Sequence, residues 1–575
     1  MDLEDAEWRL VLFFPPVHDF AMPHLSLPSL QGYVESNSNW VCESIDLNLA
    51  FFKWVFGRGF DAMLHSSKTS IDKNITTNPV ESVLELHRKI DECLVSWSNQ
   101  FPGYVLSSRM LKTPFDQKTS QGLSNAVASK DNVFTDTFRR LIKEKTLKDI
   151  DLFGVNLSVE DQLIPGLTLC KILRDDFPNS KIVVGGTLAT RLQNGLFSKA
   201  LRNLFDYLVV REGEEPLLSV LKALEKQTQA EDPRVLQSKP ESVKQPMIVT
   251  NLDTLPSPEF QDINPHEYLS PYDIIPISLG RKCSWGKCDF CSIHTTWDPM
   301  VRFRPIEAVI RDIQFYLKRY DVSHYRIVDE SPPIDRLREF SLALLESKLS
   351  IKYEAYCRLD ARLLEENTSK TLSESGCAQL FFGLESFGSE TLHLVNKGYS
   401  VSKIKNIFAT MASEEIVNYV FVIMGIPGAS IDDENLTINY LINDFNVHSV
   451  ALASFVVDRN SPIHLRSSVA EKYGIRVFEE GDMTTEIGYA RHGYDPRIDV
   501  KNRAKELTAE LYRQRPDIAL MSLLNEEFRF ALACSFGNKF AQKFVGSCTR
   551  TEIDSIISRA TERGVTERIT RELKG

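Results

Sequence analysis

The sequence LGRKCSWGKCDFC, residues 279–291, contains three cysteines, Cys283, Cys288 and Cys291, in the spacing C-x4-C-x2-C. A lone cysteine is usually a small buried hydrophobe. Three cysteines this close together, in a loop that also carries Gly286 and basic side chains, cannot all point into a core. The pattern therefore predicts a loop whose thiolates hold a metal ion or an iron–sulfur cluster.

Two kinds of site fit three grouped thiolates. A structural zinc site takes four ligands, and the nearby fourth candidate is His294. A four-iron cluster held by three thiolates leaves one iron open, and a substrate or cosubstrate can coordinate there. A zinc site would make the protein a non-catalytic scaffold held together by the metal, whereas an iron–sulfur cluster with an open iron would make it an enzyme.

The run GRKCSWGKCDFC resembles the cluster loop of radical S-adenosylmethionine (SAM) enzymes, which reductively cleave SAM to a 5′-deoxyadenosyl radical. The usual family spacing is C-x3-C-x2-C, so the extra residue between Cys283 and Cys288 is a departure. Longer first gaps also occur in the branch that carries an N-terminal cobalamin-binding-type domain. The resemblance covers roughly residues 9–455, and it implies that Cys283, Cys288 and Cys291 ligate a [4Fe–4S] cluster with SAM on the fourth iron.

The length, charge and composition of the chain limit its domain number and the classes of partner that it can have. A chain of 575 residues predicts about three or four domains. The net charge of −11 argues against a broad nucleic-acid-binding face. No run approaches the ~18 apolar residues of a membrane span, and the N-terminus is acidic where a signal peptide would be basic. Ten cysteines without a secretion signal indicate reduced thiols, so we expect a cytoplasmic protein without nucleic-acid or membrane partners.

The N-terminal part alternates between short apolar runs and helix-length segments. Such alternation predicts a doubly wound parallel sheet within residues 1–225, interrupted by a helical insertion over about 51–150. Within the insertion, residues 80–97 have helical spacing, and the polar stretch 116–132 is typical of a loop. The layout resembles the Rossmann-like cobalamin (B12)-binding domain that precedes many radical SAM cores. The predicted strands are 9–14, 41–47, 151–157, 181–184 and 207–210.

Ligands of such sheets bind at the carboxyl ends of the strands. The resemblance therefore implies a cobalamin site at this edge, although ordinary turn chemistry is an alternative for each single residue. The candidate residues are Asp46, Asn48, Ser158, Gly185, Gly186 and Glu212.

Cobalamin enzymes that place a histidine on cobalt carry Asp-x-His-x-x-Gly after the first or second strand. Here the chain reads Pro-Pro-Val-His18-Asp after the first strand and Asp46-Leu-Asn-Leu after the second. The sequence therefore predicts that any bound cobalamin has no histidine ligand.

A polar, proline-punctuated linker is predicted over residues 226–272. The following residues, 273–455, contain six apolar runs separated by helix-length segments, which predicts a partial (βα)6 barrel of the TIM type with its chemistry at the strand carboxyl ends. Residues 456–575 are expected to form a mostly helical C-terminal module. The six predicted barrel strands are 274–279, 325–328, 353–357, 380–382, 419–424 and 450–455.

The resemblance also assigns residues to SAM. Aromatic packing and close backbone approach suit the adenine, and carboxylates or a guanidinium suit the ammonium and carboxylate groups. Ordinary salt bridges, loop packing and turn glycines are the alternatives at these positions. The implied SAM residues are Phe290, Asp329, Glu330, Arg358, Gly383, Glu385, Gly425 and Gly428.

By resemblance, the function is cobalamin-dependent methyl transfer to an unactivated carbon of a peptide or natural-product intermediate. The alternative is a radical SAM oxidation, rearrangement or coupling without cobalamin. Either activity needs an external one-electron donor of the flavodoxin or ferredoxin type.

Replacing Cys283, Cys288 and Cys291 together by alanine is expected to abolish the broad iron–sulfur absorbance and SAM cleavage while the protein stays folded, because the cluster loses its ligands. Iron content, absorbance and 5′-deoxyadenosine formation under reducing conditions measure the effect. Replacing the isolated Cys357 and Cys377 serves as the control and should leave the iron content unchanged. Formation of 5′-deoxyadenosine by the triple variant would contradict the assignment.

Overall fold

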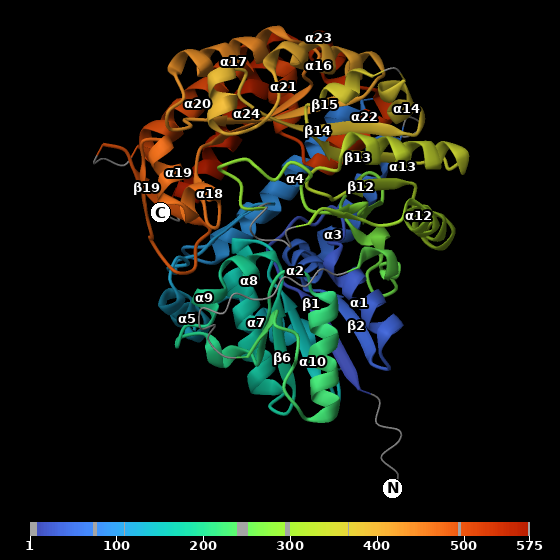
Figure 1. Ribbon diagram of the computed structural model, residues 1–575, viewed down its shortest axis with the longest axis vertical. Helices are drawn as coiled ribbons and strands as arrows, with labels where there is room; N and C mark the ends of the chain where they lie inside the picture. The colour runs from blue at the N-terminus through green and yellow to red at the C-terminus, as the bar shows by residue number, and fades with distance from the viewer. Residues whose placement is uncertain are drawn as a thin grey trace.

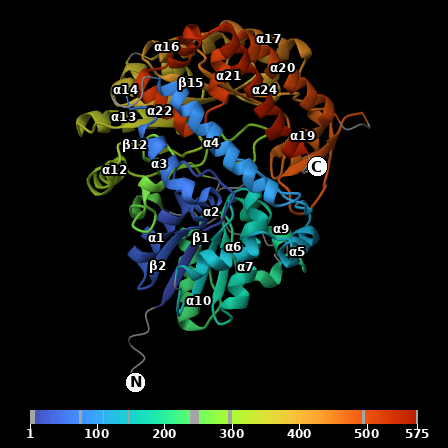
Figure 2. The same ribbon diagram turned by 180° about the vertical axis from the view of Figure 1, so that it is seen from behind.

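The computed structural model describes residues 8–72, 78–108, 110–145, 147–237, 251–293, 300–365, 367–492 and 496–572. Two α/β bodies lie one above the other, with the N-terminal sheet at the bottom of Figure 1 and the second sheet above it. Helix α4 (Pro79–Gln100) runs diagonally across the back of the molecule and spans both bodies (Figure 2).

The N-terminal sheet has six strands in the order β2-β1-β5-β6-β7-β8. The first five are parallel, as the alternation predicts, and β8 pairs antiparallel with β7 inside the stretch predicted as a linker. Strand β1 (RLVLFF) buries five of its six residues, as a strand covered on both faces requires. The bounds are β1 Arg9–Phe14, β2 Val41–Asp46, β5 Leu152–Asn156, β6 Lys181–Gly185, β7 Tyr207–Val209 and β8 Val235–Leu236.

Helices cover this sheet and give it the doubly wound arrangement. Helix α1 packs with α10, and α7 packs against β5 and β6. Their bounds are α1 Ser26–Asn37, α2 Leu47–Phe56, α7 Leu163–Asp176, α8 Thr187–Arg191, α9 Gln193–Leu196 and α10 Glu214–Lys226.

The insertion contains helix α5, where the polar composition predicted a loop. Thr119 caps α5 by accepting a hydrogen bond from the amide of Gly122, and Leu123 and Val127 are buried on its inner face. A narrow apolar stripe was enough to form a helix because neighbouring α7 covers it. The elements are α3 Phe60–Thr69, β3 Val105–Leu106, β4 Leu111–Lys112, α5 Ser120–Ala128 and α6 Phe134–Lys143.

The second sheet is a partial barrel of six parallel strands in the order β16-β15-β14-β13-β12-β9. Each strand lies where the sequence predicts one. The strands are β9 Ile274–Ile277, β12 His324–Ile327, β13 Lys352–Cys357, β14 Cys377–Glu385, β15 Val417–Met424 and β16 Ser449–Ser454. The helices between them are α12 Ile306–Tyr320, α13 Ile334–Glu346, α14 Thr368–Glu374, α15 Ser389–Leu394, α16 Ile404–Ser413 and α17 Ile431–Asn443.

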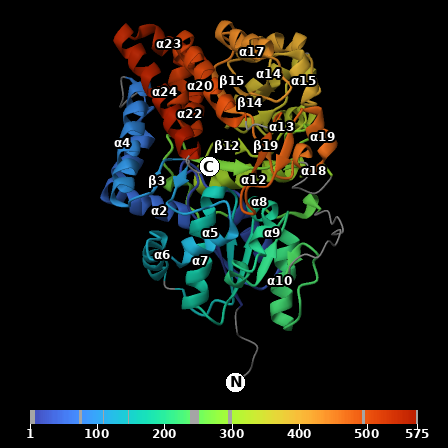
Figure 3. The ribbon, with the colours of Figure 1, turned by 90° about the vertical axis from the view of Figure 1, so that its left-hand side faces the viewer.

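The C-terminal part is mostly helical, but it begins with a small antiparallel sheet in the order β17-β19-β18 that the sequence did not reveal. These strands are too short to show an alternating apolar and polar pattern in the sequence. In β19, for example, only Ile487, Gly488 and Tyr489 are buried. Helices α20 and α21 then pack on β16, and α22 packs on β14 (Figure 3). The bounds are β17 Val457–Asp458, α18 Pro462–Leu465, α19 Ser467–Lys472, β18 Arg476–Phe478, β19 Glu486–Ala490, α20 Arg497–Gln514, α21 Pro516–Ser522, α22 Glu526–Phe536, α23 Phe540–Ser547 and α24 Arg550–Glu572.

Among the helices that the structure describes, none combines the length and the apolar character needed to cross a bilayer.

Candidate functional site

The cysteine loop leaves the carboxyl end of β9 through a two-residue hairpin base. Strand β10 (Gly280–Arg281) pairs antiparallel with β11 (Arg302–Phe303), so the loop begins and ends at one point of the barrel rim. Gly286 has a φ of +59°, which a glycine adopts readily. The hairpin base therefore presents Cys283, Cys288 and Cys291 together at the mouth of the barrel, where all three are half-buried.

The three thiols interact with one another. Burial raises the pKa of Cys291 to about 12, and the neighbouring Cys288 and Cys283 add to this effect. Burial also raises the pKa of Cys288, although the positive charges of Lys397 and Arg358 oppose it. In the described ranges no group of three or more His, Cys, Asp or Glu side chains is gathered as a ready site for one metal ion. The fourth zinc candidate, His294, lies outside the described residues.

Asp329 fixes the beginning of the loop. Its Oδ2 accepts a hydrogen bond of 2.8 Å from the amide of Leu279, and the side chain is almost fully buried. Burial raises the pKa of Asp329 to about 7 and, in the same way, raises the pKa of Glu330. Both predicted SAM residues thus lie beside the cysteine loop at the end of β12, and Asp329 already has a structural contact there.

A second anchor comes from the segment after β14. Glu385 has a φ of +61° at an irregularity in the β14–β15 pairing, and its Oε1 accepts a hydrogen bond of 2.5 Å from Lys397 Nζ. Burial opposes the charge of Lys397, yet Glu385 and the Cys288 sulfur hold its pKa above the ordinary value. Arg358 donates to the carbonyl of Lys397 at 2.7 Å. The predicted residues Arg358 and Glu385 therefore meet at one buried lysine.

Sequence reasoning missed Lys397 and Trp285. Trp285 lies inside the cysteine loop, and its indole N–H donates to the carbonyl of Asn396 at 2.8 Å. The guanidinium of Arg358 lies 4.4 Å from the centroid of the Trp285 ring, at cation–π distance. A tryptophan between two cysteines was the available signal, but its partner is more than a hundred residues away in the sequence.

The glycines assigned to SAM have close neighbours in the protein. A Cβ on Gly383 would approach Lys397 Nζ to 2.7 Å, and a Cβ on Gly425 would approach Val500 of α20 to 2.2 Å. Gly428 has a φ of +87°, which favours glycine. Phe290 packs against the small apolar cluster that contains Val395, which corresponds to the loop-packing alternative.

The end of the loop is held by the C-terminal part. Asp289 Oδ2 accepts hydrogen bonds from Lys472 Nζ at 2.9 Å and from the Tyr473 hydroxyl at 3.2 Å. The Ser292 hydroxyl donates to Asp458, which also pairs with Arg191 of α8. The loop thus contacts the N-terminal body, the barrel and the C-terminal module.

Glu212, a predicted cobalamin residue, joins the two α/β bodies. Its fully buried carboxylate accepts hydrogen bonds from Arg281 Nη1 at 2.6 Å and Arg302 Nη1 at 3.0 Å, and Glu214 binds Arg281 as well. Burial opposes ionisation, but the hydrogen bonds and charges of the two arginines outweigh it and hold the pKa of Glu212 below its usual value. The carboxylate clamps both strands of the cysteine hairpin to the edge of the N-terminal sheet.

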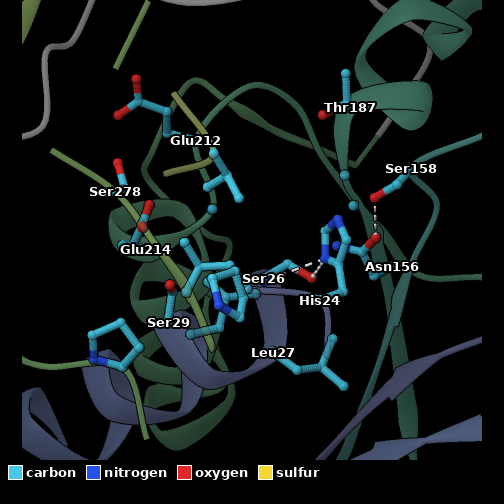
Figure 4. A pocket seen from close by; sticks show the side chains of 18 of the residues that line it. His24, Ser26, Leu27, Ser29, Asn156, Ser158, Thr187, Glu212, Glu214 and Ser278 are labelled. Carbon is cyan, nitrogen blue, oxygen red and sulfur yellow. Dashed lines mark hydrogen bonds between the residues drawn. The ribbon is translucent and has the colours of Figure 1, made fainter. Parts of the chain in front are cut away.

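A cavity of ≈ 380 Å³ lies beside this clamp, between the rim of the N-terminal sheet and the ends of β9 and β12. Ser158, Gly185, Gly186 and Glu212 line it, as the sequence predicts for a ligand at this edge. Figure 4 shows Ser158 and Thr187 on one side of the cavity and Glu212 with Ser278 on the other. Many of the other lining residues are apolar side chains of the sheet and of α1.

Asp46 and Asn48 are not among the residues that line this cavity. Asp46 caps α2 through the amide of Leu49 at 2.8 Å and accepts from the Tyr268 hydroxyl at 2.5 Å. Asn48 accepts from the amide of His18 at 2.9 Å. Both residues stabilise the turn after β2 and the neighbouring loop, so the structure does not bring them to the cavity with the other four.

His24 lines the cavity although the sequence gave no reason to select it. Its ring stacks on Phe14 with a centroid distance of 4.5 Å, and Nδ1 lies 2.7 Å from the Ser26 hydroxyl (Figure 4). Burial lowers the pKa of His24 to about 3, and neighbouring His18 adds to this effect. The imidazole is therefore neutral at physiological pH.

A second, larger cavity of ≈ 1190 Å³ lies on the other side of the segment 22–24. The N-terminal body, the insertion, the barrel and the C-terminal part all contribute to its wall. The two cavities share Met22, Pro23, His24 and Ser158, so this short segment forms the wall between them.

Residues 277–441, from β9 to α17, match the family model of the Radical SAM superfamily. This segment is a radical SAM domain. The predicted family is therefore confirmed, and the match begins two residues before the cysteine stretch and ends within the last helix of the barrel. The chain therefore contains the domain of a family that uses a [4Fe–4S] cluster and SAM.

Several curated relatives are methyltransferases by name. An uncharacterized methyltransferase of Pyrococcus horikoshii is 22% identical over 352 residues, which cover 59% of this chain and 72% of the relative. The cytidylyl-2-hydroxyethylphosphonate methyltransferase of Streptomyces wedmorensis is 24% identical over 211 residues, which cover 33% of this chain and 38% of that enzyme.

Solved structures show the same overall fold at low identity. The radical SAM methyltransferase TsrM from Kitasatospora setae, with tryptophan and a SAM analogue bound, has a TM-score of 0.60 at 12% identity over 99% of this chain and 100% of that chain. The cobalamin-dependent radical SAM enzyme OxsB, with aqua-cobalamin and SAM bound, has a TM-score of 0.58 at 14% identity over 99% of this chain and 80% of that chain. The predicted fold, a Rossmann-like domain followed by a partial barrel and a mostly helical module, is confirmed.

Replacing Glu212 by glutamine is expected to destabilise the protein by about 3 kcal/mol, because Arg281 and Arg302 both lose a fully buried carboxylate partner. Since the pKa of Glu212 is lowered in the folded state, its contribution is present near neutral pH and is lost as the pH falls below the usual glutamate value of about 4.3. Urea unfolding of the wild type and Glu212→Gln at several pH values measures both effects.

The exposed Glu231→Gln is the control and should change the stability by no more than about 0.5 kcal/mol. Equal stability of wild type and Glu212→Gln at neutral pH would show that the clamp contributes nothing.

Proposed function

We propose that the protein is a cobalamin-dependent radical SAM methyltransferase that acts on an unactivated carbon of a peptide or small natural-product intermediate. The observation that carries this proposal is the cavity beside Glu212. It is bounded by the rim of a B12-type sheet on one side and by the strand ends that deliver the cysteine loop on the other. The names of the relatives and the contents of the TsrM and OxsB structures support the same activity.

The residues present fit a [4Fe–4S] cluster. Cys283, Cys288 and Cys291 are free thiols on one loop, and the cations of Lys397 and Arg358 lie where they compensate the negative charge of an iron–sulfur cluster with thiolate ligands. When bound, the cluster supplies the electron that cleaves SAM. Trp285, through Asn396, and Asp329, through Leu279, hold the loop in place.

The lining of the first cavity also suits part of a cobalamin. Gly186 has a φ of +106°, and a Cβ there would lie 2.4 Å from the carbonyl oxygen of Leu157, so no side chain stands at this point of the rim. The apolar side chains that point from β1, β5 and β6 into the cavity suit a large organic ligand. We assign Ser158, Gly185, Gly186 and His24 to contacts with this ligand, with Glu212 keeping the two walls together.

For SAM we assign Glu385, Arg358, Asp329 and Glu330 to the polar groups. Carboxylates accept from an ammonium, and a guanidinium pairs with a carboxylate. The pairing of Glu385 with Lys397 positions the carboxylate beside Cys288. The electron donor is expected to be a flavodoxin- or ferredoxin-type protein of the cytoplasm.

Glu385→Gln is expected to weaken SAM binding about tenfold or more without loss of iron, because a charge-assisted hydrogen bond is worth roughly 1.5–3 kcal/mol. Equilibrium binding of SAM to the cluster-loaded protein measures the change. Glu390→Gln, an exposed carboxylate at the start of α15, is the matched control and should bind SAM like the wild type. Unchanged affinity in Glu385→Gln with full iron content would leave Glu385 as the partner of Lys397 only.

A corrinoid bound by the reconstituted protein is expected to lack a histidine ligand, since the Asp-x-His-x-x-Gly motif is absent. Electron paramagnetic resonance of the Co(II) form tests this, with no superhyperfine splitting from an axial nitrogen as the expected result. His24→Phe makes the test specific, because His24 is the histidine that lines the first cavity.

Nitrogen splitting that His24→Phe removes would identify His24 as a cobalt ligand and overturn the prediction. If no corrinoid binds even after reconstitution, the methyltransferase proposal fails and a radical SAM oxidation, rearrangement or coupling takes its place.

A further inference from the structure

One guanidinium in the wall of the larger cavity faces three carboxylates. Arg326 of β12 is 7% exposed; its Nε donates to Glu354 Oε1 at 2.6 Å and its Nη1 to Glu527 Oε1 at 2.7 Å. Glu526 Oε2 lies 3.5 Å from the same Nη1. Arg529 Nη2 lies 3.9 Å from Glu526 Oε1, so three carboxylates share two guanidinium groups and negative charge is in excess at this end of the cavity.

Of the carboxylates around Arg326, Glu527 is the one with a buried oxygen that lacks a donor among the described residues. Both carboxylate oxygens of Glu354 have hydrogen-bond partners, because the second oxygen accepts a hydrogen bond from Gln379 at 2.7 Å. Glu527, in the first turn of α22, is 2% exposed, and its Oε2 has no hydrogen-bond partner among the described residues. Burial raises the pKa of Glu527, and Asp19 adds to this effect more strongly than Arg326 opposes it. A buried carboxylate oxygen without a donor is costly unless a ligand supplies one.

Lys501 also lines the cavity, and three other cations of its wall have acidic partners. Lys118 and Arg497 both pair with Glu480, and Arg191 pairs with Asp458. These three cations thus pair with two acids, neither of which is Glu527. A cationic group on a molecule that enters the cavity would supply the donor that Glu527 Oε2 lacks.

The neighbouring surface suits an organic cation. Tyr356 and Phe455 line the same cavity as Glu527. Tyr356 stacks on Phe381 with a centroid distance of 4.8 Å, which keeps its ring in place. Carboxylates and aromatic faces together bind ammonium and guanidinium groups.

We propose that Glu527, held by Arg326, binds a positively charged nitrogen group of the substrate, an ammonium or a guanidinium. The inference rests on the proposed function only in taking the larger cavity as the substrate site. It narrows the substrate class to molecules with a cationic nitrogen, such as an amino acid, an amine or a peptide with a free amino terminus or a basic side chain. Arg326 is a positioning residue in this arrangement, since its Nη1 fixes the Glu527 carboxylate.

Two small molecules that carry the same phenyl ring, one with a positive and one with a negative charge, test the proposal. Phenethylamine and 3-phenylpropionate are titrated into the full-length protein, purified without oxygen, and binding is followed by saturation-transfer NMR. The amine is expected to bind at least tenfold more tightly than the acid. Glu527→Gln should weaken amine binding tenfold or more, which corresponds to the loss of one charge-assisted contact.

Glu480→Gln is the matched control, because it removes a cavity carboxylate that already has two cationic partners, and it should change amine binding less than twofold. Equal or tighter binding of 3-phenylpropionate, unchanged amine affinity in Glu527→Gln, or no amine binding up to about 10 mM would each overturn the proposal. The comparison of the two probes on the wild type needs no variant, so it decides the matter even if Glu527→Gln does not fold. None of these readouts depends on corrinoid or SAM, so failure here is distinguishable from failure of the methyltransferase proposal.

Discussion

The buried carboxylate of Glu212 is the contact on which the arrangement of the cofactor sites depends. It comes from the N-terminal sheet, and it binds both strands of the hairpin that carries the cysteine loop. Removing one partner of a buried ion pair destabilises a protein by more than forming the pair stabilises it, because the remaining charge is left buried without a counter-charge or water. The clamp therefore fixes the position of the cysteine hairpin relative to the N-terminal body.

The cysteine loop illustrates how a segment with little secondary structure of its own becomes ordered. Asp329 holds its start, the Trp285–Asn396 hydrogen bond holds its middle, and Asp289 and Ser292 hold its end. Each anchor comes from a different element. A loop whose backbone is fixed in this way has less conformational freedom to lose when its thiols bind a cluster, so less ordering entropy opposes binding.

The two cavities separate two kinds of chemistry. The smaller one is mostly apolar and borders the clamp, whereas the larger one is lined with ionised groups, most of them paired. Glu527 pairs with Arg326 through one oxygen only, and buried charge without full compensation is more often found where a ligand completes it. The segment 22–24 lies between the cavities, so a substrate in one and a cofactor in the other would meet at His24 and its neighbours.

The sequence by itself determined the strands and the three cysteines, because apolar runs of strand length and ligand spacing are local properties. It also placed Glu385, Arg358 and Asp329 at the barrel rim, since the carboxyl ends of parallel strands share one edge. It failed for helix α5 and the β17–β19 sheet, whose short apolar patterns form only against their neighbours. Lys397, His24 and Glu527, and the inter-body role of Glu212, were decided by tertiary structure alone. Their partners lie far away along the chain, and only the folded arrangement excludes water from these charges and brings their partners within hydrogen-bonding distance.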